Sequence, residues 1–127
     1  MINIKSKHSA SLVLIFDFKS YSIKELKSNL ISGNYNVQGY VVYIYTCPPC
    51  PKGAMCKPCA PDNILISEDG KNPQNELTIF VNNSRQFEIG KKYAFSVELI
   101  NKKFSDGEVY TTFKLLGYDL ITEIIRI

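Results

Sequence analysis

Tryptophan is absent from this 127-residue chain, and histidine occurs once, as His8. A single histidine near the N-terminus argues against catalysis by a histidine pair or by a cysteine–histidine dyad. No apolar run reaches the roughly 18 residues that a transmembrane helix requires. The twelve carboxylates are scattered without an obvious pair for acid–base chemistry, and the chain has no Gly-rich phosphate-binding loop. These absences favour a non-catalytic protein.

Composition indicates one globular domain. The hydrophobic content is 45% and the charged content 21%, and 127 residues suffice for a single sizeable core. The net charge of +3 is too small to indicate a nucleic-acid partner on its own.

All four cysteines lie within thirteen residues, as Cys47, Cys50, Cys56 and Cys59. Two C-x-x-C units this close can supply four thiolates to one structural zinc ion. They can also form two disulfides, for example the nested pairs Cys47–Cys59 and Cys50–Cys56, although four cysteines permit three pairings. A redox-active C-x-x-C unit is a third alternative, but the surrounding prolines disfavour the helix that would lower a thiol pKa.

The state of the cysteines decides the expected compartment and cofactor. Disulfides predict a periplasmic or secreted protein without a cofactor, whereas a zinc site predicts a cytoplasmic protein with one structural Zn. Residues 1–21 form an N-terminal lead-in, which we interpret as a degenerate signal peptide or an extra strand. Lys5, Lys7 and the apolar run 10–16 suit a signal peptide, but Asp17 interrupts the pattern.

A short helix is predicted over residues 22–32. Ser22 and Glu25 have the spacing of a capping box at its start. Gly33 is a plausible end. One apolar face at helical spacing is expected to lie on the body of the domain, formed by Ile23, Leu26, Leu30 and Ile31.

From Val37 onward the pattern changes to strands. Five are predicted, over residues 37–46, 63–67, 76–81, 93–100 and 109–116, and the tail 119–127 suits a short helix or a last strand equally. In the fourth strand, alternation predicts one inward face, made of Tyr93, Phe95, Val97 and Leu99.

Five consecutive strands, a long first strand and the phrase Phe87-Glu-Ile-Gly-Lys-Lys-Tyr93 carry a family resemblance. Residues 37–117 resemble an OB-fold, the oligonucleotide- and oligosaccharide-binding barrel. The resemblance implies an all-β, small five-stranded OB-like barrel over 22–127. An N-terminal capping helix and a Pro/Cys-rich loop between strands 1 and 2 complete it. An OB-fold usually has a helix between strands three and four, but residues 82–91 are too short and polar for a good one. The rival, an immunoglobulin-like sandwich, would need about seven strands.

The resemblance predicts a ligand across strands two and three, beside the cysteine loop. Lys52 and Lys57 are the charged residues of that loop, and Tyr43, Tyr45 and Phe80, with Tyr40, could form a stacking platform. The alternative for these rings is ordinary packing between strands. We therefore expect a non-catalytic binding or accessory module, with a protein or oligosaccharide partner slightly favoured over nucleic acid. A single-stranded nucleic-acid-binding protein and a thiol-redox protein are the alternatives. Nothing in the sequence indicates the oligomeric state.

Overall fold

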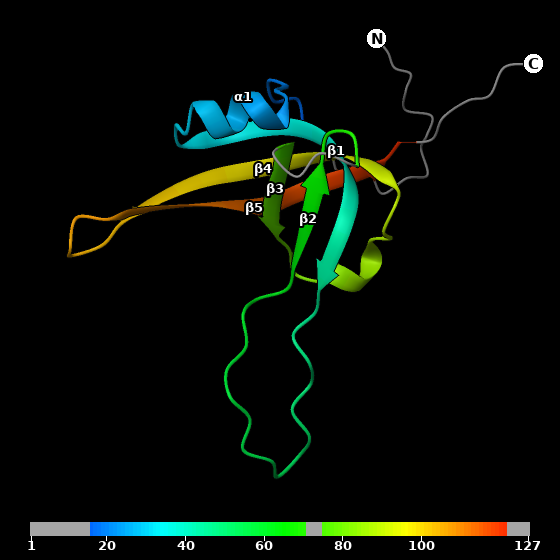
Figure 1. The fold of residues 1–127 in the computed structure, drawn as a ribbon, viewed down its shortest axis with the longest axis vertical. Coiled ribbons are helices and arrows are strands. Elements are labelled where there is room, and N and C mark those ends of the chain that lie inside the picture. Colours follow the sequence, from blue (N-terminus) through cyan, green and yellow to red (C-terminus); the bar gives the residue numbers. More distant parts are fainter. Residues whose placement is uncertain (1–15, 71–74, 122–127) are drawn as a thin grey trace, which may run out of the picture.

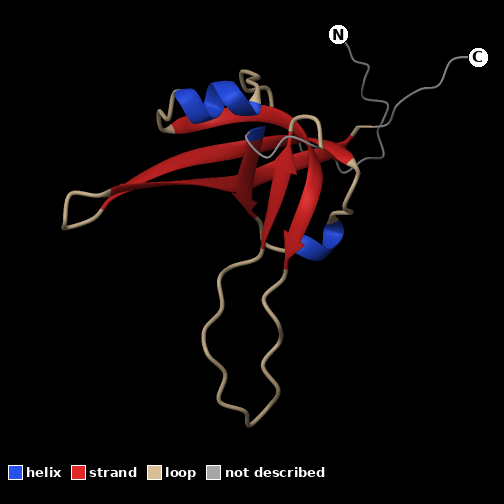
Figure 2. Ribbon diagram, viewed as in Figure 1, coloured by secondary structure: helices blue, strands red, loops and turns tan. Residues whose placement is uncertain are grey.

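The computed structural model describes residues 16–70 and 75–121. The signal-peptide interpretation of residues 1–15 and the prediction for 122–127 fall outside these ranges. Strands dominate the described chain (Figure 2). The elements in order are α1 (Ile23–Ser28), β1 (Gly33–Tyr45), β2 (Asn63–Ser67), β3 (Glu76–Phe80), the 3-10 helix η3 (Ser84–Gln86), β4 (Lys92–Lys103) and β5 (Val109–Leu120).

The five strands form one closed ring in the order β1-β2-β3-β5-β4 (Figure 1). The first half of β1 pairs with β4, and the second half pairs with β2, both antiparallel. The ring closes between β3 and β5 through a single parallel pair, Phe80 and Lys114. The predicted all-β class, the five strands and the position of the cysteine loop between β1 and β2 are thus confirmed.

The bend that lets β1 serve two partners lies in its middle. The pairing with β2 shifts register between Val41 and Tyr43, which marks a bulge. Just before it, a Cβ atom on Gly39 would lie 3.1 Å from the carbonyl oxygen of Ser67. Glycine at position 39 therefore allows the two backbones to approach where the ring turns.

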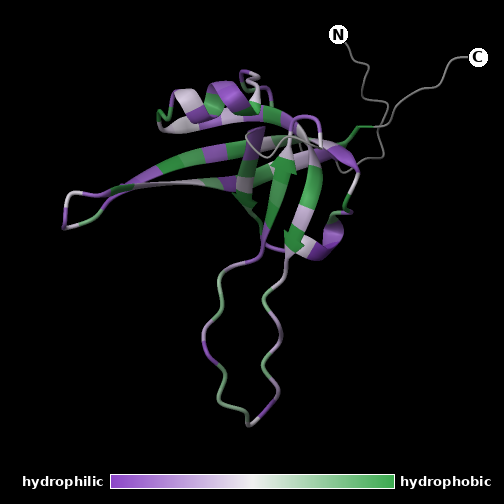
Figure 3. Ribbon diagram, viewed as in Figure 1, coloured by the Kyte–Doolittle hydropathy of each residue, from purple (hydrophilic) through white to green (hydrophobic). Residues whose placement is uncertain are grey.

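The core fills the ring with apolar side chains from every strand and from α1. Hydrophobic and hydrophilic residues are interspersed along β4, whereas β2 is mostly hydrophobic (Figure 3). The predicted inward face of β4 is confirmed, since Tyr93, Phe95, Val97 and Leu99 are all buried. The other buried apolar residues are Ile23, Leu26, Val37, Val41, Ile64, Ile66, Leu77, Ile79, Val81, Phe87 and Phe113.

Helix α1 begins as predicted but ends early. Ser22 and Glu25 form both hydrogen bonds of the capping box. The helix ends at Ser28 rather than at residue 32, with Asn29 as its C-cap, so Gly33 starts β1 instead of stopping the helix. Ile23 and Leu26 enter the core, whereas the predicted face fails at Leu30 and Ile31, which are exposed.

Residues 16–21, assigned to the lead-in, lie beside β1. Asn36 bonds through its backbone to Lys19 and Tyr21, and its side-chain amide donates to the carbonyl oxygen of Phe16 at 2.8 Å. Ser96 points away from the core but is fully buried. Its hydroxyl donates to the Asn36 side chain and accepts from the Phe16 N–H, so the buried hydroxyl has hydrogen-bond partners.

Four of the five strands have bounds that differ from the prediction, and β3 ends at Phe80 rather than at residue 81. β1 starts four residues earlier, at Gly33 instead of Val37, and β4 and β5 are longer than predicted. Beyond Leu99 the hairpin of β4 and β5 leaves β1 and continues as a two-stranded ribbon that projects from the ring (Figure 1). Between β3 and β4 the chain forms only the three-residue η3, in agreement with the expected lack of a good helix there.

Candidate functional site

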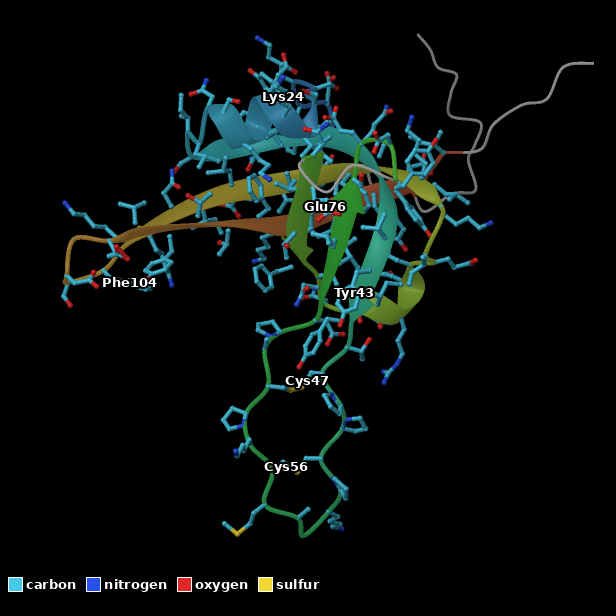
Figure 4. The ribbon with its side chains drawn as sticks, in the orientation of Figure 1. Lys24, Tyr43, Cys47, Cys56, Glu76 and Phe104 are labelled. Carbon is cyan, nitrogen blue, oxygen red and sulfur yellow. A yellow bond between two sulfur atoms is a disulfide. The ribbon has the colours of Figure 1, made fainter. Side chains whose placement is uncertain are left out.

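The loop between β1 and β2 contains two nested disulfides. Cys47 is bonded to Cys59 and Cys50 to Cys56, with Cα–Cα distances of 5.8 and 6.0 Å. Figure 4 shows the first near the ring and the second farther along the projecting loop. The disulfide alternative, in its nested form, is therefore the one that the structure contains.

This pairing differs from the arrangements that the two other interpretations of the cysteines would require. A zinc site needs four thiolates, but all four sulfur atoms are bonded in pairs. In residues 16–70 and 75–121, no cluster of three or more His, Cys, Asp or Glu side chains could hold a metal ion. A redox-active C-x-x-C unit forms its disulfide between its own two cysteines. Here each disulfide joins one unit to the other.

The far end of the loop is a tight turn. The Ala54 N–H donates to the Pro51 carbonyl at 3.0 Å, and Gly53 has a φ of +82°, which favours glycine. Every residue from 48 to 61 is exposed, and Met55 is 100% exposed. Lys52 and Lys57 therefore lie on an exposed part of the loop.

One carboxylate fixes the base of the loop. Asp62 accepts the Cys47 N–H at 2.8 Å, and it accepts both the N–H and the hydroxyl of Ser84 at 3.1 Å. Ser84 is buried and its hydroxyl also contacts that of Thr46 at 2.6 Å. These donors, the Cys47 N–H first, lower the pKa of Asp62. Sequence reasoning missed this cluster, because its members lie on three separate segments.

Two of the predicted aromatic side chains lie in one row across the outer face of the closed sheet. Tyr45 lies opposite Asn63 on β2, and Asn63 lies opposite Phe80 on β3. Tyr43, two residues before Tyr45 on β1, points out of the same face and is 55% exposed, whereas Tyr45 and Phe80 are half-buried. Tyr40 lies on the other side of the bulge, where the Lys92 ammonium sits 5.5 Å from its ring centroid.

The predicted site residues are only partly brought together. The three aromatic residues lie on the sheet, whereas Lys52 and Lys57 lie near the end of the loop. Figure 4 shows this separation between Tyr43, on the sheet, and Cys56, next to Lys57. The face also presents Thr78, which lies opposite Leu65 and is exposed.

The projecting ribbon carries two exposed aromatic side chains that were not predicted from the sequence as site residues. Phe104 and Tyr110 are each 48% exposed, and their ring centroids are 4.6 Å apart. The ribbon and the disulfide loop project from the ring in different directions (Figure 1). The outer face of β2 and β3 thus lies between two projecting arms.

Comparison of the chain with protein-family models and with curated proteins finds no match. Within the part of the chain that the structure describes, no helix is long and apolar enough to cross a membrane.

Proposed function

We propose that this protein is a non-catalytic binding module built on an OB-type barrel. The strand order supports the proposal, because the ring joins β1 to both β2 and β4 and brings β3 alongside β5. An OB-fold is a five-stranded Greek-key barrel whose strands 2 and 3, with the loops after strands 1 and 4, bind oligonucleotides or oligosaccharides. The corresponding loops here are the disulfide loop and the tip of the β4–β5 ribbon.

The ligand that the outer face fits best is an oligosaccharide. The observation that carries this proposal is the exposed Tyr43, which lies on the same face as Tyr45 and Phe80. Rings of this kind can stack on the apolar faces of sugars. The amide of Asn63 and the hydroxyl of Thr78, on the same strands, can exchange hydrogen bonds with sugar hydroxyls. A nucleic-acid strand would gain from Lys52 and Lys57, but these lie beside the turn at the far end of the exposed loop, whereas the aromatic rings lie on the strands.

The disulfides support an oxidising compartment for this activity. Disulfides persist in the periplasm and in secreted proteins, and they are rare where thiols are kept reduced. A periplasmic or secreted location also suits a protein that meets free or surface glycans.

Binding of neutral oligosaccharides of different backbones, measured by isothermal titration calorimetry, tests the proposal. Tyr43→Ala should lower the affinity at least about tenfold, which corresponds to roughly 1.4 kcal/mol. Phe16→Ala is the matched control, because the Phe16 ring is 47% exposed but lies beside the first half of β1, away from β2 and β3. Equal losses in the two variants, or no loss at Tyr43, would contradict the assigned face.

An oligothymidylate measured in the same way tests the nucleic-acid alternative. Two results would together favour nucleic acid over the oligosaccharide. The affinity for the oligothymidylate would fall steeply with added salt, and it would fall further in the Lys52→Glu/Lys57→Glu double variant.

A further inference from the structure

A groove beside the seam between β3 and β5 has the features of a small-molecule site. The seam is the weakest part of the ring, since Phe80 and Lys114 are its one paired position in the described chain. Phe80 and Lys114 both line a groove of about 390 Å³ beside this pair. Its lining residues are Pro61, Phe80, Val81, Asn82, Ile100, Thr112, Phe113 and Lys114.

The lining of this groove is apolar with a few polar groups at known positions. Val81 and Phe113 are buried, and Phe80 and Ile100 are half-buried, so together they present a hydrophobic surface. The polar side chains are those of Asn82, Thr112 and Lys114. Small-molecule sites typically combine such an apolar lining with a small number of polar groups that orient the ligand.

Lys114 is the one charged residue in the lining of this groove, and it is exposed. Glu98 lies opposite it on β4, but no ion pair within 4.0 Å joins Lys114 to a carboxylate in the described chain. The lysine is therefore free to pair with an anionic group of a ligand. A neighbouring groove of about 340 Å³ shares Phe80, Thr112 and Phe113 but is lined by both Lys27 and Glu76, so its charges offset each other.

We propose that the groove at Lys114 binds a small apolar acid. The aromatic or aliphatic body of the ligand lies on Phe80 and Ile100, and its carboxylate pairs with the Lys114 ammonium. The volume of the groove falls at the lower end of the range of about 300–1,000 Å³ for small-molecule pockets, which suits a ligand of one or two rings. The groove shares Phe80 with the outer face that carries Tyr43, but the proposal does not rest on oligosaccharide binding to that face.

Nuclear magnetic resonance titration of the 15N-labelled full chain tests the proposal with two matched probes. The probes are 2-naphthoate, an apolar acid, and 2-naphthalenemethanol, its uncharged analogue. We expect 2-naphthoate to shift the amide signals of residues 80–82 and 112–114 and to bind about tenfold more tightly than the alcohol, as a charge-assisted hydrogen bond predicts. Equal affinities, shifts confined to other residues, or no shift at millimolar concentration would overturn the proposal.

Three variants separate the charge from the cavity. Lys114→Gln should remove the preference for the acid and leave binding of the alcohol unchanged. Glu98→Gln, which removes the opposing carboxylate, should keep or strengthen acid binding. Thr112→Trp should abolish binding of both probes, because the indole fills the groove from an exposed position. Retained acid preference in Lys114→Gln would overturn the assignment of this lysine, and the amide spectrum of each variant reports whether it is folded.

Discussion

Asp62 joins three segments of the chain through one side chain. Its carboxylate holds the Cys47 N–H after β1 and the N–H and hydroxyl of Ser84 in η3, while its own backbone leads into β2. The pKa of Asp62 is lowered from its ordinary value of 3.8 by these donors, the Cys47 N–H first. A carboxyl with a lower pKa in the folded chain adds stability above its unfolded pKa. That stability is lost as the pH falls through the folded pKa.

Asp62→Asn should therefore lower the urea midpoint of unfolding at neutral pH, since asparagine keeps one acceptor oxygen and loses the charge. The gap between the parent and the variant should be constant above pH 3.8, the ordinary pKa, and should shrink as the pH falls below it. Urea unfolding across this pH range measures the gap. Asp106→Asn is the control, because Asp106 bonds only within the exposed tip of the ribbon. A gap that does not change with pH would contradict the role of the charge.

The alternation of β4 makes a second prediction for single residues. Val97 is 0% exposed, so Val97→Asp would bury an unpaired charge and should prevent folding. Glu98 points to the other face, so Glu98→Gln should change the stability by no more than about 0.5 kcal/mol. Circular dichroism during heating measures both variants. A Val97→Asp protein that melts like the parent would show that this position is not part of the core.

Among the elements, a short apolar strand set between polar and turn residues could be predicted from sequence, and those whose ends depend on distant partners could not. The bounds of β2 match the prediction exactly at Asn63 and Ser67. The start of β1 was missed because residues 33–36 are mostly polar, and they form a strand since β4 supplies their pairing partner. The end of α1 was missed because Leu30 and Ile31 continue an apolar pattern that the fold does not use.

The candidate site shows the same division. The rings of Tyr43, Tyr45 and Phe80 could be selected from strand periodicity, and the register places them on one face. The Asp62 cluster and the groove at Lys114 could not, because each depends on how separate strands meet around the ring. The cysteine spacing limited the pairing to a few alternatives without choosing among them.

The two disulfides should contribute unequally to stability. Cys47–Cys59 closes the loop directly beside the ends of β1 and β2, whereas Cys50–Cys56 lies within the exposed part of the loop. Replacing both Cys47 and Cys59 by serine should lower the free energy of unfolding by about 1–3 kcal/mol. Without this disulfide the unfolded chain is no longer held in a closed loop, so its conformational entropy is larger. Replacing both Cys50 and Cys56 should lower the free energy of unfolding by less, because the Cys47–Cys59 disulfide encloses that segment and already restricts it in the unfolded chain.

Urea unfolding of the two paired variants, with intact mass to verify the remaining disulfide, gives this comparison. Paired replacement avoids leaving a single reactive thiol. A larger loss from the Cys50/Cys56 pair would mean that the far end of the loop contacts the ring.

At the scale of the whole molecule, the hydrophobic core and the disulfide loop are built from separate parts of the chain. None of the buried apolar residues lies between Thr46 and Pro61. The core comes from the strands, α1 and the connection after β3. A segment that buries no apolar surface adds little to the hydrophobic free energy of folding. The Cys50–Cys56 disulfide therefore acts mainly on the conformation of the loop, and a loop ordered in advance binds a partner at a lower entropic cost.

Removing the loop should leave the ring folded. The Cα atoms of Cys47 and Cys59 are 5.8 Å apart, which a short turn can span. We expect a variant with Asn-Gly in place of residues 48–58, and with Cys47 and Cys59 changed to serine, to keep the strand content and the amide spectrum of the parent outside the replaced region. Asn-Gly is the turn that antiparallel strands prefer. Circular dichroism and a 15N amide spectrum measure this, and the parent with its disulfides reduced is the control for loss of the cross-links alone. If the loop-free chain failed to fold while the reduced parent stayed folded, loop residues other than the cysteines would be required for the fold. If both stay folded and oligosaccharide affinity falls only in the loop-free chain, the loop acts in binding, as the proposed function requires.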